Sequence, residues 1–229
     1  MKLQKIRALV CLAALLSIAG LAVVSDLSVS ARVYTTPLIL IDPGHGGFDP
    51  GAIGQDTQVE ECQINLDISK LLKAELEQKG YRVELTREKD QALAHTKKED
   101  MQARRNMILQ SGADLVLSIH QNSDKDRASS GPLVIYYAKS ESGQRIAQAI
   151  QSQLDTALGS KKKHRAVAQT DKYILKSGEM PILIVECGFL SNSQEEAFLQ
   201  SEQGQQAIAK AIAEGVCQTL PVAGSTSTP

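Results

Sequence analysis

Two histidines and several carboxylates stand beside predicted turns and strand ends, where such side chains can do metal and acid–base chemistry. His45 lies in the glycine-rich run DPGHGGFD, and His120 directly follows the apolar run LVLSI. Two imidazoles and one carboxylate form a common catalytic zinc set that leaves a fourth position for water. Glu61, at the start of a predicted helix, is the candidate carboxylate, and its neighbour Glu60 competes for the same role. The pattern predicts a metal site with two histidines and one glutamate.

Glu186 is a further candidate because it ends the apolar run PILIV. An unpaired carboxylate is costly to bury, so an acid at the end of a buried strand calls for an explanation. A free carboxylate beside a metal-activated water is suited to accept a proton from that water and to protonate a leaving amine. Each feature also has a structural explanation. A histidine in a glycine-rich loop is often only hydrogen-bonded, and an acid in the first turn of a helix favours the helix dipole.

The elements that must position these residues alternate along the chain between strands and helices. We predict strands over residues 37–42, 81–86, 114–120, 131–137 and 181–186, and helices over residues 63–79, 98–110 and 142–158 and from about residues 194 and 204. This alternation predicts a single α/β domain, with a mostly parallel central sheet and helices on both faces. Ligands bind at the carboxyl ends of the strands in such sheets. The two histidines and Glu186 all fall at that edge.

The N-terminal segment has the pattern of an export signal. A basic stretch, MKLQKIR, precedes an apolar run over residues 8–24. We therefore expect residues 1–30 to form a signal peptide or an N-terminal membrane anchor, and the rest of the chain to act outside the cytoplasm. The run is near the lower length limit for a membrane span, and cleavage and retention both stay open. Residues 37–220 are expected to form the catalytic domain, and residues 221–229 a disordered tail.

The overall charge argues against nucleic acid as a partner. The formal net charge is −1, and three of the 25 basic residues, Lys2, Lys5 and Arg7, lie at the N-terminus, which leaves 22 basic against 26 acidic residues. A nucleic-acid-binding domain would normally be strongly basic. The basic cluster at residues 161–165 is interpreted as a solvated loop. Tyr136 and Tyr137 are interpreted as packing residues.

The cysteines do not predict a disulfide framework. Cys11 lies inside the apolar N-terminal run, and the remaining three, Cys62, Cys187 and Cys217, are odd in number and show no CxxC spacing. A cysteine-rich metal site is therefore also disfavoured. We expect these three side chains to behave as small apolar residues.

Four segments together carry a family resemblance. ILIDPGHGGFDPGAIG, EECQINLDISKLLKAELEQKGYRVELTREKD, GADLVLSIHQNS and PILIVECGFLSNSQEEAFL resemble, in order, the signatures of the zinc-dependent N-acetylmuramoyl-L-alanine amidases of catalytic domain type 3. The resemblance covers nearly all of residues 37–220. It implies hydrolysis of the amide between N-acetylmuramic acid and L-alanine in peptidoglycan.

The resemblance also implies roles for individual residues. By position, His45, Glu61 and His120 match the family's zinc ligands, and Glu186 matches its catalytic glutamate. Glu61 is preferred to Glu60 because the family's ligand glutamate is followed by two residues and then an apolar-Asn-Leu helix start, here Ile-Asn-Leu. Cys62 departs from the charged residue that is usual at its position, and a cysteine thiolate reaching the metal is the less favoured alternative. The arginine at position 104 resembles a helical arginine of the family, for which a structural role suffices.

Within the family, the chain most resembles the germination-specific amidases of spore-forming bacteria, including its segments at residues 97–100 and 172–176. In that subgroup the amidase strips peptides from muramic acid so that muramic lactam can form in the spore cortex. The alternatives are a general vegetative wall amidase, a non-catalytic wall-binding protein on the same fold, and another metal hydrolase such as a peptidase or deacetylase. Stem-peptide preference, oligomeric state and the need for an activating protein partner stay open.

Overall fold

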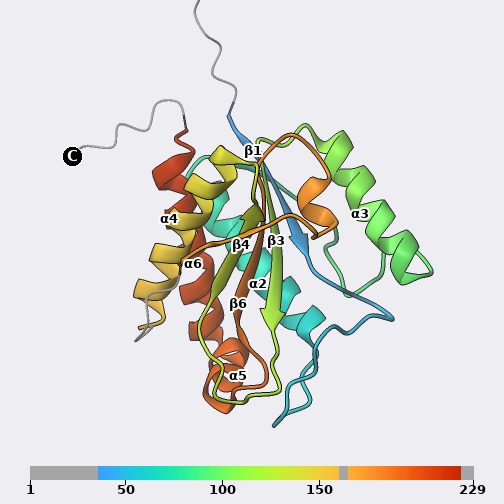
Figure 1. Ribbon diagram of the computed structural model, residues 1–229, viewed down its shortest axis with the longest axis vertical. Helices are drawn as coiled ribbons and strands as arrows, with labels where there is room; N and C mark the ends of the chain where they lie inside the picture. Colours follow the sequence, from blue (N-terminus) through green and yellow to red (C-terminus); the bar gives the residue numbers. More distant parts are fainter. Residues whose placement is uncertain (1–35, 160–164, 223–229) are drawn as a thin grey trace, which may run out of the picture. The chain divides into compact units, whose positions relative to one another are not determined.

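The computed structural model describes residues 36–159 and 165–222. Figure 1 shows them as strands and helices that alternate along most of the chain. The strands are β1 (Leu38–Pro43), β2 (Arg82–Leu85), β3 (Leu115–Asn122), β4 (Leu133–Tyr137), β5 (Val167–Gln169) and β6 (Ile182–Phe189). The helices are α2 (Glu61–Gln78), α3 (Lys97–Ser111), α4 (Glu141–Ala157), the 3-10 turn η1 (Ile174–Lys176), α5 (Ser193–Gln200) and α6 (Glu202–Thr219).

The strands form one six-stranded sheet in the order β2-β1-β3-β6-β4-β5. Every neighbouring pair is parallel except β4 and β6, which are antiparallel. β1 is buried along its whole length, as expected for a strand of a parallel sheet with both faces covered. The predicted fold class, a single α/β domain with a mostly parallel sheet, is confirmed.

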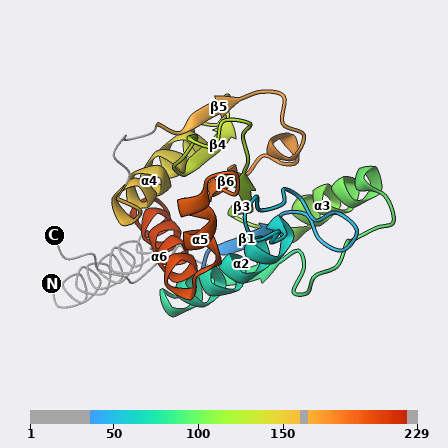
Figure 2. The same ribbon diagram turned by 90° about the horizontal axis from the view of Figure 1, so that it is seen from below.

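Helices cover both faces of this sheet. The larger core cluster packs one face against α2, α4 and α6, through residues such as Ile41, Leu72 and Ile212. The smaller cluster packs the other face against α3 and η1, through residues such as Leu40, Ile108 and Ile174. Figure 2 shows α2 and α6 together on one side of the strands and α3 apart from them. Successive residues of a strand therefore face different helices.

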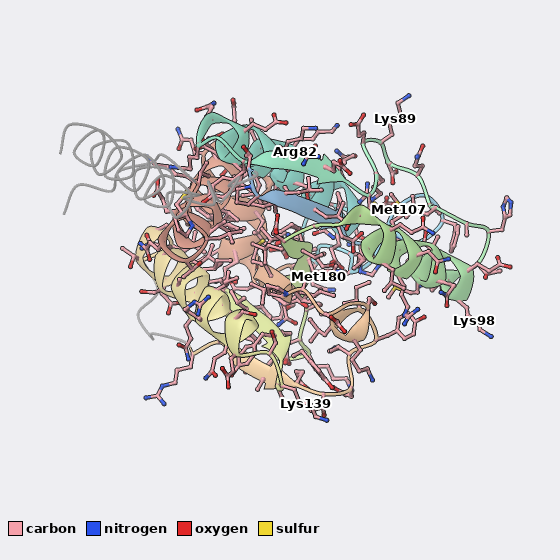
Figure 3. All side chains as sticks on the ribbon, turned by 90° about the horizontal axis from the view of Figure 1, so that it is seen from above. Arg82, Lys89, Lys98, Met107, Lys139 and Met180 are labelled. Carbon is pink, nitrogen blue, oxygen red and sulfur yellow. The ribbon has the colours of Figure 1, made fainter. Side chains whose placement is uncertain are left out.

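Side chains at the margin of the second cluster show where the domain meets solvent. Met180, just before β6, is half-buried and packs against this cluster, and Figure 3 shows it near the middle of the view. Lys98 at the start of α3 and Lys139 after β4 are exposed and extend outward in the same view. The exposed residues of α3 are polar except Leu109, which is 48% exposed, so the face that points away from the sheet is mostly polar, as is usual for a helix packed on one side only.

Several elements differ from the sequence-based expectation. The short strand β5 and the turn η1 were not predicted, and β3 and β6 run to Asn122 and Phe189, beyond their predicted ends. Helix α2 begins at Glu61, two residues earlier than predicted, so this glutamate is itself in the first turn. β5 has only three residues, too few to show an alternation of apolar and polar side chains.

Three predictions concern residues that the structure does not describe. The N-terminal segment and most of the basic cluster at residues 161–165 lie outside the described residues, and so does the tail from residue 223. Val222, the last described residue, still packs against the larger core cluster. Among residues 36–159 and 165–222, no helix is long and apolar enough to cross a membrane.

Candidate metal centre and catalytic site

His45 lies in the loop that follows β1, where the backbone turns sharply. It adopts φ +61°, in the left-handed region that non-glycine residues enter rarely. Gly44 precedes it, and a Cβ atom at Gly44 would lie 2.2 Å from the His120 ring. Only a glycine therefore lets the loop pass this close to His120. The same loop places His45 opposite the first turn of α2, because Glu61 N donates to Ala52 O and Cys62 N donates to Pro50 O.

The structure brings His45, Glu61 and His120 together, although 59 positions separate Glu61 from His120. One ligand atom from each residue lies within 4.8 Å of the others. His45 Nε2 is 3.3 Å from Glu61 Oε2, and His120 Nδ1 is 3.0 Å from Glu61 Oε1. The two imidazole rings meet edge to face, with their centroids 4.9 Å apart. Two nitrogen donors and one carboxylate at this spacing fit a single divalent transition-metal ion.

The Glu61 carboxylate is fixed from several sides. Oε2 accepts a hydrogen bond from Ala52 N at 2.8 Å, and Oε1 accepts from Gln121 N at 3.0 Å and from Asn65 Nδ2 at 3.1 Å. Burial alone would raise the pKa of Glu61, but the hydrogen bonds to His120 and His45 hold it well below its ordinary value. The carboxylate is therefore ionised and oriented, as a metal ligand must be.

His45 has a second carboxylate on its other side. Its Nδ1 lies 2.9 Å from Asp49 Oδ2, and Lys97 Nζ lies 2.7 Å from Asp49 Oδ1. Burial alone would lower the pKa of His45, but Glu61 and then Asp49 raise it above the ordinary value. A carboxylate on the far nitrogen of a metal-binding histidine fixes the tautomer and the ring orientation. Asp49 is thus suited to orient the His45 ring so that its Nε2 atom points towards Glu61.

Glu186 reaches the same edge of the sheet from β6. It pairs with His120 in the parallel ladder between β3 and β6, and it follows Ile182 and Ile184 on the face that packs against α3. Among the described residues its Oε2 atom is buried and has no hydrogen-bond partner. Burial raises the pKa of Glu186, although the charge of His120 opposes this effect. A buried carboxylate oxygen without a partner beside two histidines is available for a proton or a reacting group.

A small cavity of about 130 Å³ opens beside the two histidines. Phe48, which is 49% exposed, borders it next to His45, while Met101 and Ile174 form its apolar side. Asp42 and Arg104 line it together with His45 and His120, so the cavity extends towards the buried ion pair between β1 and α3. An apolar pocket with a few convergent polar groups is the usual form of a substrate site.

The residues that support His45, Glu61 and His120 were not predicted from the sequence. Asp49 contacts His45, and Asn65 and Gln121 donate hydrogen bonds to Glu61. An asparagine among the apolar positions of the predicted helix was the available signal for Asn65, because a buried asparagine must find hydrogen-bond partners. Arg104 was assigned a structural role, and the structure gives it a direct hydrogen bond to the His45 carbonyl, at 2.6 Å.

The cysteines lie apart from the triad. Cys62 and Cys187 are buried, Cys217 is half-buried, and all three are free thiols. Burial, with Asp90 and Glu60 nearby, raises the pKa of the Cys62 thiol to about 12. Cys62 lies in a second acidic group with Glu60 and Asp90, separate from the histidines. The predicted apolar role of these cysteines agrees with their burial.

Comparison with known proteins decides the family. Residues 39–218 match the model of the N-acetylmuramoyl-L-alanine amidase family. The chain belongs to this amidase family. The predicted enzyme class is thereby confirmed, and the amidase acts on peptidoglycan outside the cytoplasm.

Individual relatives agree with this assignment. The amidase is 32% identical over 187 residues to the germination-specific N-acetylmuramoyl-L-alanine amidase of Bacillus subtilis, and the match covers 78% of each chain. It is 32% identical over 179 residues to the B. subtilis amidase LytC, which covers 77% of this chain and 34% of LytC. Its fold is similar to that of the CwlD amidase from Clostridioides difficile, solved in complex with the GerS lipoprotein, with a TM-score of 0.78 and 32% identity over 81% of this chain and 98% of CwlD.

Proposed function

We propose that the amidase is a zinc enzyme in which His45, Glu61 and His120 hold the metal and Glu186 transfers protons. The observation that carries the proposal is the approach of one ligand atom from each of the first three residues to within 4.8 Å. Three protein ligands and a neighbouring free carboxylate are the composition of a catalytic zinc site. When bound, zinc would polarise the scissile carbonyl and lower the pKa of water to about 7.

The protein residues then divide the remaining work. Glu186 accepts a proton from the attacking water and delivers it to the alanine nitrogen as the carbon–nitrogen bond breaks. Its raised pKa favours this exchange, because a group that both takes and gives a proton works best when its pKa approaches the working pH. The apolar cavity bordered by Phe48 and Met101 would receive the substrate beside the histidines.

We further propose that the amidase acts in the spore cortex, where removal of the stem peptide from muramic acid precedes muramic lactam formation. The similarity to the germination-specific amidase of B. subtilis supports this role. The structure of CwlD with GerS supports an expectation that this amidase too works with a protein partner. Residues 1–30 would carry the chain to the outer side of the membrane, either as a cleaved signal or as an anchor.

Product analysis tests the reaction. Purified cortex and vegetative wall are digested side by side with the amidase, and the products are identified by mass spectrometry. We expect intact stem peptides with a free L-alanine N-terminus, released preferentially from cortex. Release of acetate would instead indicate a deacetylase, and peptides cut within the stem a peptidase. Equal release from both walls would contradict the cortex role and favour a general wall amidase.

A further inference from the structure

Three consecutive carbonyl oxygens of the loop that carries His45 are held by buried side chains. Pro43 O accepts from Arg87 Nε at 3.0 Å and from Arg104 Nη1 at 2.8 Å. Gly44 O accepts from Arg87 Nη2 at 2.9 Å and from Asn65 Nδ2 at 3.2 Å. His45 O accepts from Arg104 Nη2 at 2.6 Å. Two guanidinium groups therefore fix the backbone at the residue that enters the left-handed region.

Arg87 also connects the two segments that carry ligands. Its Nη2 donates to Gly44 O and, at 2.8 Å, to Cys62 O, so one nitrogen bonds to the residue before His45 and the residue after Glu61. Its Nη1 donates to Lys89 O at 3.0 Å. The guanidinium thus sets the separation of the two backbone segments from which His45 and Glu61 extend.

The burial of Arg87 needs an explanation. The side chain is 2% exposed, and its four hydrogen bonds all end on carbonyl oxygens. In the part of the chain that the structure describes, no carboxylate lies within ion-pair distance of it. Burying a guanidinium without an acidic partner is costly. Fixing the loop geometry is a role that would justify this cost.

Arg104 anchors the same loop to the rigid elements behind it. Its Nη1 lies 2.7 Å from Asp42 Oδ1, and its Nε lies 2.7 Å from Asp100 Oδ2 in the same helix. Asp42 also accepts from Thr86 Oγ1 at 2.6 Å and from Ser118 Oγ at 3.0 Å. The guanidinium that binds His45 O is therefore itself held by side chains of β1 and α3, and through Asp42 by β3.

We propose that Arg87 and Arg104 are positioning residues that hold His45 in its left-handed conformation and at a fixed separation from Glu61 before the metal binds. The proposal rests on the proposed zinc site. A non-glycine residue in this conformation is strained, and it keeps the conformation only when contacts with its surroundings stabilise it. If the loop relaxed in the metal-free protein, it would have to be reordered on binding, and affinity would fall.

The test is the zinc affinity of the Arg87→Lys variant. Lysine keeps the positive charge, but its single ammonium cannot reproduce the planar fork that reaches four carbonyls. We expect the dissociation constant for zinc, measured by competition with a chromophoric chelator, to rise about 10–100-fold, the usual range for residues that support metal ligands. The absorption spectrum of the cobalt-substituted protein should change as well, because it reports the ligand geometry. Arg104→Lys is expected to act in the same direction, and it replaces Arg87→Lys if that variant does not fold.

A control separates geometry from general destabilisation. Ile150→Val and Leu154→Ala alter buried residues of α4 in the larger core, away from the site. The control is whichever of these two variants has an unfolding free energy equal to that of the arginine variant. It should bind zinc as the unmodified protein does. Unchanged zinc affinity in both arginine variants, or an equal loss in the control, would overturn the positioning role. Failure of the unmodified protein to bind zinc would overturn the proposed function itself.

Discussion

Glu186→Gln is expected to lower turnover by about 10²–10⁴-fold while the fold and zinc binding persist, the range that general acid–base residues contribute. Glutamine has nearly the same shape as glutamate, but it cannot accept a proton from water and return it to an amine. The buried, unpartnered Oε2 atom is the position at which that proton would be held. Release of stem peptides from purified peptidoglycan, with zinc content measured on the same samples, checks the prediction.

The matched control for this variant is Glu179→Gln. Glu179 is an exposed glutamate that lies shortly before β6, and the same chemical change there should leave turnover unchanged. A Glu186→Gln protein that retains zinc and cleaves at the normal rate would show that another group transfers the proton. Loss of zinc together with activity would instead assign Glu186 to the metal site.

Glu61→Gln is expected to reduce zinc affinity more than about 100-fold, because even residues outside the ligand set commonly change metal affinity 10–100-fold. The substitution removes the negative charge that faces both His45 and His120, at 3.3 and 3.0 Å. Hydrolysis should fall in parallel and should recover in part at high zinc concentration. Zinc titration of the metal-free variant measures the affinity directly.

The adjacent glutamate supplies a control for this prediction. Glu60 is exposed and precedes α2, whereas Glu61 is 3% exposed and points to the histidines. Glu60→Gln should therefore leave zinc affinity and turnover close to those of the unmodified protein. The opposite ranking of the two variants would move the metal ligand to Glu60.

The sequence predicted most of the fold because its buried strands are strongly apolar. Residues 38–41 are all apolar, residues 115–119 are apolar except Ser118, and each segment forms a buried central strand. The antiparallel direction of β4 was not predictable in the same way, because its apolar residues would suit either direction. β5 and η1 were missed because three-residue elements depend on tertiary contacts and not on a local pattern.

The residues proposed to react or to bind metal could be predicted from the sequence, but the residues that hold them in position could not. His45, His120 and Glu186 follow from residue type and from their position at strand ends, and the family resemblance separated Glu61 from Glu60. Arg87 lies in the polar stretch after β2, where an arginine would ordinarily be exposed. Its burial and its hydrogen bonds to Gly44 and Cys62 depend on the folded loop, which no local pattern encodes.

The most direct test of the account is metal analysis combined with chelation of the purified amidase. We predict about one zinc ion per active chain, loss of stem-peptide release when a chelator removes it, and recovery on addition of stoichiometric zinc. The protein should remain folded throughout, because the sheet and its two core clusters do not depend on the ion. An active enzyme that holds no transition metal and resists chelators would contradict the account.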